Sequence, residues 1–264
     1  MTLSVNTNTT AASSARMLNI NHAQLQRSLT RLSTGRRINS PADDAGGLAV
    51  SMKMSAAIRR NTAVQNNVNN AISFLQTQDG ALGTFGSILE RISELKMLHQ
   101  DITKSASDKA NYTTEYKQLV AQLNNLKAEK FNNVTLFGAT LAAVAITEDG
   151  GQTVALTKIT LAAVVGSVSK ASLANLTLGT ITTAIGNIAT YRATNGASSN
   201  RLQYALDMLS INKVNLEAAN GRILDADIAS ESTEFAKLQI LSQANSAMLS
   251  QANLLPQAAL RLIS

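Results

Sequence analysis

The sequence predicts a mainly α fold, a long helical bundle or coiled coil built from both chain ends, with a small β-containing middle segment. Apolar residues near both ends recur in steps of three and four, the spacing of a helix seam. The 264 residues include only two prolines, so long stretches lack the strongest helix breaker. Between the helical stretches lies a segment rich in Ala, Val, Ile, Thr and Gly, which interrupts the periodicity.

A first helix is indicated by an apolar seam near the N-terminus. Its positions are Leu18, His22, Leu25, Leu29 and Leu32. The steps alternate between four and three residues, as in the a and d positions of a coiled coil. Gly35 follows the seam and predicts the helix exit.

A long second helix is predicted to begin just after Ser40. Ser40 can cap the helix, and Pro41 is pre-set for the first helical position. Asp43 stands where the acid of a capping box belongs, and Asp44 adds negative charge near the positive end of the helix dipole. A helix from about residue 42 to about residue 100 would be about 90 Å long, a length typical of fibres and bundles.

The remaining elements follow in order along the chain. A helical pattern runs through residues 112–126, and residues 147–152, between two β-branched runs, predict a hairpin. Helical periodicity returns after residue 198, and Asp225 or Asp227 can cap the last helix. The seam of the last helix is Leu238, Leu241, Asn245, Met248, Ala252 and Leu255.

The two ends of the chain complement each other in charge and in shape. Residues 1–42 carry five arginines and no acid, whereas the last helix opens on acidic residues. Neither end can bury its seam alone, so the two are expected to pair. The expected domains are an inner coiled coil of 1–40 and 225–264, a long-helix shell of 41–138 and 186–224, and a short variable surface segment of 139–185 with a β-hairpin.

Several function classes are disfavoured by composition. The chain has no cysteine and two histidines, so neither thiolate metal sites nor a histidine-based triad can be assembled readily. We therefore expect no catalytic residue, no metal, no cofactor and no enzyme. The net charge is +6, but no basic cluster interleaved with aromatic residues indicates nucleic acid. No apolar stretch reaches the length of a membrane helix or the pattern of a cleavable signal peptide.

Several motifs resemble those of bacterial flagellin. Residues 32–47 read LSTGRRINSPADDAGG and are similar to the family's segment LSTG.RINS..DDAAG. Residues 91–95, RISEL, are similar to the segment R.REL, and residues 251–257, QANLLPQ, to the tail QAN..PQ. The motifs stand in the family's order, and the resemblance covers about residues 1–138 and 190–264.

The resemblance implies a structural subunit that polymerises into the helical filament of the bacterial flagellum. It implies export by the flagellar type III apparatus, with the help of a chaperone and without a cleaved signal peptide. The exported subunits are then expected to assemble beneath a filament cap, on a filament that hook-filament junction proteins join to the hook. The location implied is extracellular, with neither nucleic acid nor membrane as partner. Alternatives from the sequence are a hook-filament junction protein of the same family and a secreted helical translocator or toxin that inserts into membranes.

The resemblance also assigns site residues. The seam residues that it places in assembly are Leu18, Leu25, Leu29, Leu32, Leu238, Leu241, Met248 and Leu255. The motif that joins the inner and outer helices supplies Arg36, Arg37, Asn39, Asp43 and Asp44. Residues that match the family's contact with an innate immune receptor of animals are Arg91, Leu95 and Glu115, although Ser93 stands where the family has a second Arg.

Overall fold

The computed structural model describes residues 7–138, 143–169 and 172–261, with side chains described up to residue 254 in the last range. The chain forms two compact units, Met1–Ala56 with Leu216–Ser264, and Ala57–Asn215. Helices α2 (Ala45–Gln100) and α5 (Leu178–Leu224) contribute residues to both. The predicted mainly α class is confirmed.

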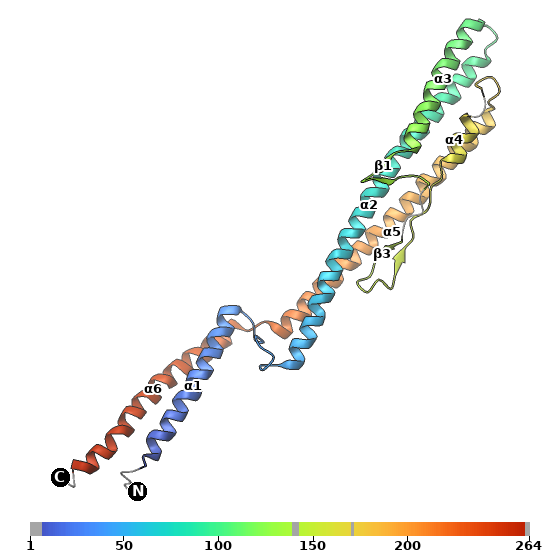
Figure 1. Ribbon diagram of the computed structural model, residues 1–264. Helices are drawn as coiled ribbons and strands as arrows, with labels where there is room; N and C mark the ends of the chain where they lie inside the picture. The colour runs from blue at the N-terminus through green and yellow to red at the C-terminus, as the bar shows by residue number, and fades with distance from the viewer. Residues whose placement is uncertain (1–6, 139–142, 170–171, 262–264) are drawn as a thin grey trace. The chain divides into compact units, whose positions relative to one another are not determined.

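The first unit contains an antiparallel pair of helices, α1 (Thr9–Thr34) and α6 (Ile228–Arg261). The two helices lie side by side (Figure 1). At one end of the pair the Asn8 side chain donates to the Ala252 carbonyl oxygen at 2.8 Å. At the other end the Ala226 backbone N–H donates to the Gly35 carbonyl oxygen at 2.9 Å. The expected pairing of the two chain ends is therefore present within one subunit.

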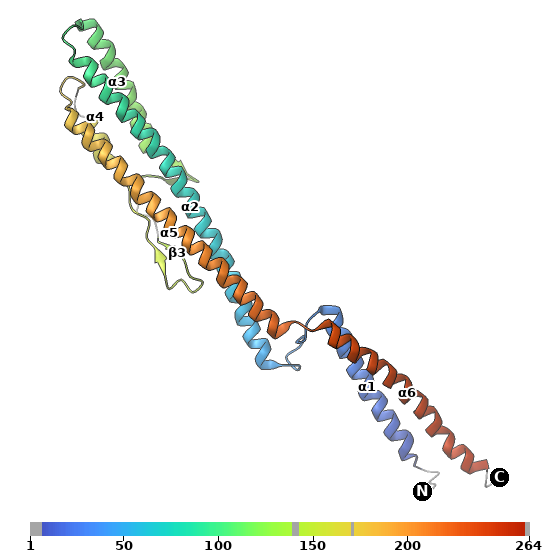
Figure 2. The same cartoon turned by 180° about the vertical axis from the view of Figure 1, so that it is seen from behind.

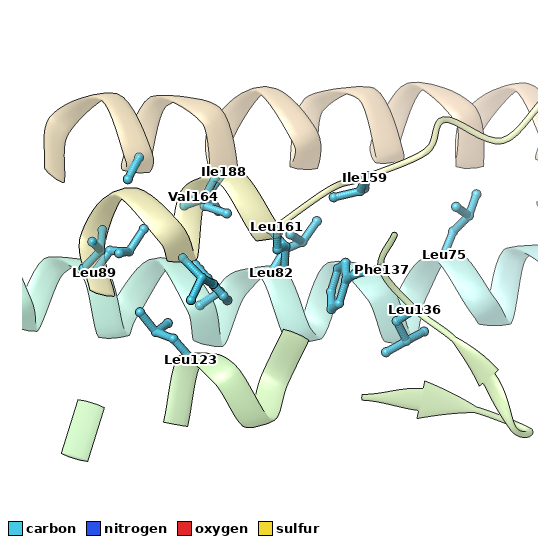
Figure 3. Packing of buried hydrophobic residues seen from close by; sticks show 14 of the residues in the cluster. Leu75, Leu82, Leu89, Leu123, Leu136, Phe137, Ile159, Leu161, Val164 and Ile188 are labelled. Carbon is cyan, nitrogen blue, oxygen red and sulfur yellow. The ribbon is translucent and has the colours of Figure 1, made fainter. Parts of the chain in front are cut away.

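The second unit packs α3 (Ala106–Lys127) and the short α4 (Ala162–Ser169) against its parts of α2 and α5. Side chains from all four helices meet in one apolar cluster (Figure 3). Fully buried members include Leu82, Phe85, Leu89, Ile92, Leu95, Leu123, Leu161, Ile181 and Leu202. The Arg192 side chain also pairs with Asp79 through two hydrogen bonds of 3.0 and 3.1 Å, which fixes α5 against α2.

Two small hairpins complete this unit. Strands β1 (Lys130–Phe131) and β2 (Val134–Thr135) pair antiparallel around Asn132 and Asn133, whose φ angles are 47° and 64°. Asparagine tolerates this left-handed region better than most residues. Strands β3 (Val144–Ala145) and β4 (Thr153–Val154) form the hairpin predicted around residues 147–152, seen beside α5 in Figures 1 and 2.

The segment 139–185 was expected to lie at the surface, and that expectation is wrong for the part of it that enters the core. Residues 139–142 and 170–171 lie outside the described residues. The remainder supplies buried side chains to the core, namely Val154, Ile159, Leu161, Val164, Val165, Val168, Leu173, Leu176, Ile181 and Ala184. Its low charge and high valine content reflect burial against α2 and α3 rather than exposure.

Two polar side chains hold this segment in place. The buried Tyr116 hydroxyl of α3 donates to the Val168 carbonyl oxygen at the end of α4. The ammonium of Lys96, on the buried face of α2, donates to the carbonyl oxygens of Leu173 and Ala174 at 3.1 and 2.9 Å. The turn between α4 and α5 is thus anchored by hydrogen bonds as well as by apolar contacts.

We predict that Leu161→Ala destabilises the second unit as much as Leu89→Ala does, by about 2–5 kcal/mol, because both remove a fully buried side chain. Urea unfolding followed by circular dichroism measures the change. An effect of Leu161→Ala within about 0.5 kcal/mol, as for a surface residue, would show that the segment is not part of the core.

Candidate functional site

The α1–α6 pair has a single seam along which each helix covers the other. The less exposed positions of α6 follow heptad spacing: Glu231, Phe235, Leu238, Ser242, Asn245, Leu249 and Ala252. On α1 the corresponding positions are Leu18, Asn21, Leu25, Ser28 and Leu32. Leucine layers therefore alternate with small polar residues along the seam.

The structure places only part of the predicted seam in this contact. Leu18, Leu25, Leu32 and Leu238 lie in it. Leu29, Leu241 and Met248 do not, because 55%, 39% and 60% of their surface is exposed. His22 is also exposed, and the side chain of Leu255 lies outside the described residues. The sequence pattern aligned apolar residues, whereas Asn21 and Ser28 are small enough to let the backbones approach.

The side chains outside the seam leave the pair with uncovered apolar surface. On α1 and α6 the exposed large apolar residues are Met17, Ile20, Leu29, Ile228, Ile240, Leu241, Met248 and Leu254. Two helices can cover only one stripe of each other, so the remaining stripes face solvent. Where such side chains gather into a patch, they mark a site of interaction with another macromolecule.

The charged side chains along the α1–α6 pair set the register of the two helices and add little to the stability of the pair. The Arg31 guanidinium lies 3.7 Å from the Glu231 carboxylate, and the Ser28 hydroxyl donates to the Glu231 carbonyl oxygen at 3.5 Å. Partly exposed ion pairs contribute about 0–1 kcal/mol. The complementary signs of the two chain ends thus orient the helices without supplying most of the binding energy.

The first half of the junction motif ties the end of α1 to the end of α5. Gly35 ends α1 with a left-handed φ of 67°, as its position after the seam predicted. Arg36 forms an antiparallel backbone bridge with Asp225. Arg37 donates its backbone N–H to the Leu224 carbonyl oxygen at 2.6 Å and its Nη2 to the Ile223 carbonyl oxygen at 2.8 Å. Both arginines therefore position the backbone of a distant segment.

The second half of the motif forms a turn that precedes α2, so the predicted cap at Ser40 is wrong and the helix begins at Ala45. The carboxylate of Asp43 accepts the backbone N–H groups of Asn39 and Ser40 at 3.2 and 2.9 Å. The Asn39 side chain in turn donates to the Arg36 carbonyl oxygen at 2.9 Å. Asp44, rather than Ser40, caps α2, because its Oδ1 accepts the Gly47 backbone N–H at 2.8 Å.

The candidate receptor residues are only partly brought together. Arg91 pairs with Glu115 and with Glu94, both at 2.7 Å, on an exposed surface of the second unit. Leu95 is fully buried in the core. Arg91 and Glu115 are therefore open to a partner, whereas the side chain of Leu95 is not.

Two other features, metal-binding clusters and membrane spans, can be assessed in the part of the chain that the structure describes. Within those residues, no group of three or more His, Cys, Asp or Glu side chains is arranged to hold a metal ion. None of the helices there combines the length and the apolarity that a membrane span requires.

We predict that Asp43 titrates below pH 3.8, its ordinary value, because hydrogen bonds from the Ser40 and Asn39 backbones lower the pKa of its carboxyl group. A lowered folded-state pKa means that the turn is stabilised above the unfolded pKa and loses this stabilisation as pH falls through the folded pKa. Carbon-13 NMR of the carboxyl group checks the midpoint, with the Ser40 amide shift as an internal control. A midpoint at or above 3.8 would contradict the assigned hydrogen bonds.

The comparisons with known proteins agree with the helical structure of both ends of the chain. Residues 5–142 match the family described as bacterial flagellin N-terminal helical region, and residues 178–263 match its C-terminal helical region. The chain is 35% identical to a flagellin of Halalkalibacterium halodurans over 98% of this chain and 99% of that protein. It is 35% identical to the flagellar filament core protein flaB2 of Brachyspira hyodysenteriae, with the same coverage of each chain.

A third relative shows the same full-length similarity. The chain is 33% identical to a flagellin of Listeria monocytogenes over 99% of this chain and 100% of that protein. Both family regions and the intervening segment are therefore present in one continuous match. The chain belongs to the bacterial flagellin family.

Proposed function

We propose that this flagellin assembles by burying the exposed apolar faces of α1 and α6 against neighbouring copies. The chain is a structural subunit of the flagellar filament and not an enzyme. The observation that carries the proposal is that the terminal pair leaves large apolar side chains uncovered on both helices, Leu29 and Met248 among them. A contact between copies that repeats without closing on itself generates a helical polymer.

The free energy gained by burying these side chains, set against the cost of association, favours contact with several neighbouring copies over contact with one. Fully burying an exposed Leu, Ile or Met side chain is worth about 1.5–3 kcal/mol. Association costs about 4–15 kcal/mol in lost translational and rotational freedom. A dimer that covers one or two of these side chains would gain little. A polymer that covers the surrounding stripes of each pair gains enough to hold the subunit.

The proposal keeps the inner and outer helical regions expected from the sequence, but not the expectation that residues 139–185 lie wholly at the surface. Residues 1–40 and 225–264 form the inner coiled coil, residues 41–138 and 186–224 form the shell around it, and residues 139–185 contribute the β3–β4 hairpin. The support is that exposed apolar residues are frequent on α1 and α6, whose burial requires neighbours on several sides.

The same proposal includes the partners of a filament subunit. They are the flagellar export apparatus and its chaperone, the filament cap and the hook-filament junction proteins, with the assembled product outside the cell and no cleaved signal peptide. Recognition by an animal innate immune receptor would use the exposed Arg91 and Glu115. Leu95 would take part only if the core beneath them opened.

We predict that Met248→Asp abolishes polymerisation and leaves the helical content of the subunit unchanged. The side chain is exposed in the free subunit, so the carboxylate stays hydrated there. In the filament it would lose its water without gaining a partner, at a cost of several kcal/mol. Sedimentation and electron microscopy measure the polymer, and far-ultraviolet circular dichroism measures the helices.

A matched control is Gln243→Asp, which adds the same charge at an exposed polar position of the same helix. We expect this variant to form filaments at a concentration within about a factor of three of the parent, since a hydrated surface charge costs less than about 0.5 kcal/mol. If Met248→Asp forms normal filaments, the face of α6 that carries Met248 is not buried between copies.

A further inference from the structure

We propose that exposed methionines on α1, α5 and α6 are oxidation sites through which peroxides reversibly prevent assembly. The sites are Met17, Met208 and Met248. The inference rests on the proposed function, because it requires that neighbouring copies cover these side chains in the polymer.

Most methionines of this chain have exposed side chains. The sequence has seven methionines and no cysteine, so no thiol competes for an oxidant. Methionine ordinarily fills gaps inside a core. Here Met17, Met52, Met97, Met208 and Met248 are each 55% to 66% exposed. Thioethers in such positions are open to a small oxidant in water.

Three of these methionines lie within exposed apolar stripes. Met17 stands three residues before the exposed Ile20 on α1, and Met248 stands seven residues after the exposed Leu241 on α6. Residues at these spacings share one face of a helix. The sulfur atoms of Met17 and Met248 therefore lie in the surface that assembly is proposed to bury.

Met208 marks a third stripe, in the second unit. On α5 the exposed Tyr204, Met208 and Ile211 follow one another at steps of four and three, and Val214 extends the same exposed surface. In the polymer a neighbouring copy would also cover this apolar surface of the second unit. A thioether again stands within it.

The chemical step needs a peroxide and no metal. The thioether sulfur attacks one peroxide oxygen, a sulfur–oxygen bond forms and the oxygen–oxygen bond breaks. With hydrogen peroxide the second oxygen leaves as water after proton transfer, so sulfur loses two electrons and the peroxide gains two. The product is a methionine sulfoxide, which methionine sulfoxide reductases return to the thioether.

The modified side chain no longer suits a packed interface. A sulfoxide is polar and its oxygen requires a hydrogen-bond donor, so burial against another copy without one is unfavourable. Exposed positions leave the fold of the free subunit intact. In a polymer that covers the sulfur atoms, the oxidant is excluded, so the free subunit is the sensitive form.

The test compares polymerisation before and after hydrogen peroxide treatment. Mass spectrometry identifies the oxidised methionines, and circular dichroism verifies that the helices remain. We expect the concentration needed to elongate sheared filament seeds to rise about tenfold or more, corresponding to 1.4 kcal/mol or more per subunit. Treatment with both epimer-specific sulfoxide reductases should restore the original concentration.

The decisive variant carries Met17→Leu, Met208→Leu and Met248→Leu. Leucine nearly matches the volume of methionine and lacks its sulfur. We expect this variant to elongate equally well before and after peroxide. The control, Met52→Leu with Met97→Leu, removes two equally exposed sulfur atoms outside the named sites and should remain as sensitive as the parent. If the triple variant fails to elongate untreated, the three single variants are compared, each with reduced sensitivity expected.

The outcomes separate the two proposals. A parent protein that never polymerises through these faces contradicts the proposed function. A parent that polymerises normally after all three sites are oxidised contradicts this inference and leaves the proposed function standing. A leucine variant as sensitive as the parent also overturns the assignment of these sites.

Discussion

Two helices packed side by side can cover only one stripe of each other, and the behaviour of this flagellin depends on that constraint. The α1–α6 seam uses leucines at heptad spacing separated by small polar residues such as Asn21 and Ser28. This composition brings the helices together with modest apolar burial. It also leaves other apolar side chains, including Leu29 and Leu241, at the surface. The free subunit thus retains exposed apolar surface, which we propose is covered by further copies.

The second unit, in contrast to the terminal helix pair, buries its apolar side chains in a core of its own. Its four helices close a continuous core in which residues such as Leu82 and Leu123 are fully buried. Buried hydrogen bonds from Tyr116 and Lys96 fix the segment between α4 and α5. A closed core folds without neighbours. Most of the buried apolar side chains therefore belong to this unit, whereas the terminal pair keeps the exposed apolar faces that we propose for assembly.

Much of the fold can be predicted from the sequence because its signals are local. Gly35 ends α1 through a left-handed conformation, and the hairpin around Gly150 follows from turn chemistry. The exact start of α2 could not be predicted, because Asp43 and Asp44 can each satisfy backbone N–H groups and only the folded turn selects between them. The seam register was missed because Asn21 and Ser28 carry no hydrophobic signal. The core role of Val164 depends on tertiary contacts that no periodicity in so short a helix reveals.

The most direct test of this account measures the accessibility of α6 in the free subunit and in the filament. The chain has no cysteine, so Leu241→Cys and Leu238→Cys each introduce a single thiol for maleimide labelling. The account predicts fast labelling at position 241 in the subunit and labelling about tenfold slower or more in the filament, with slow labelling at position 238 in both. Equal labelling at position 241 in subunit and filament would show that assembly does not cover this face.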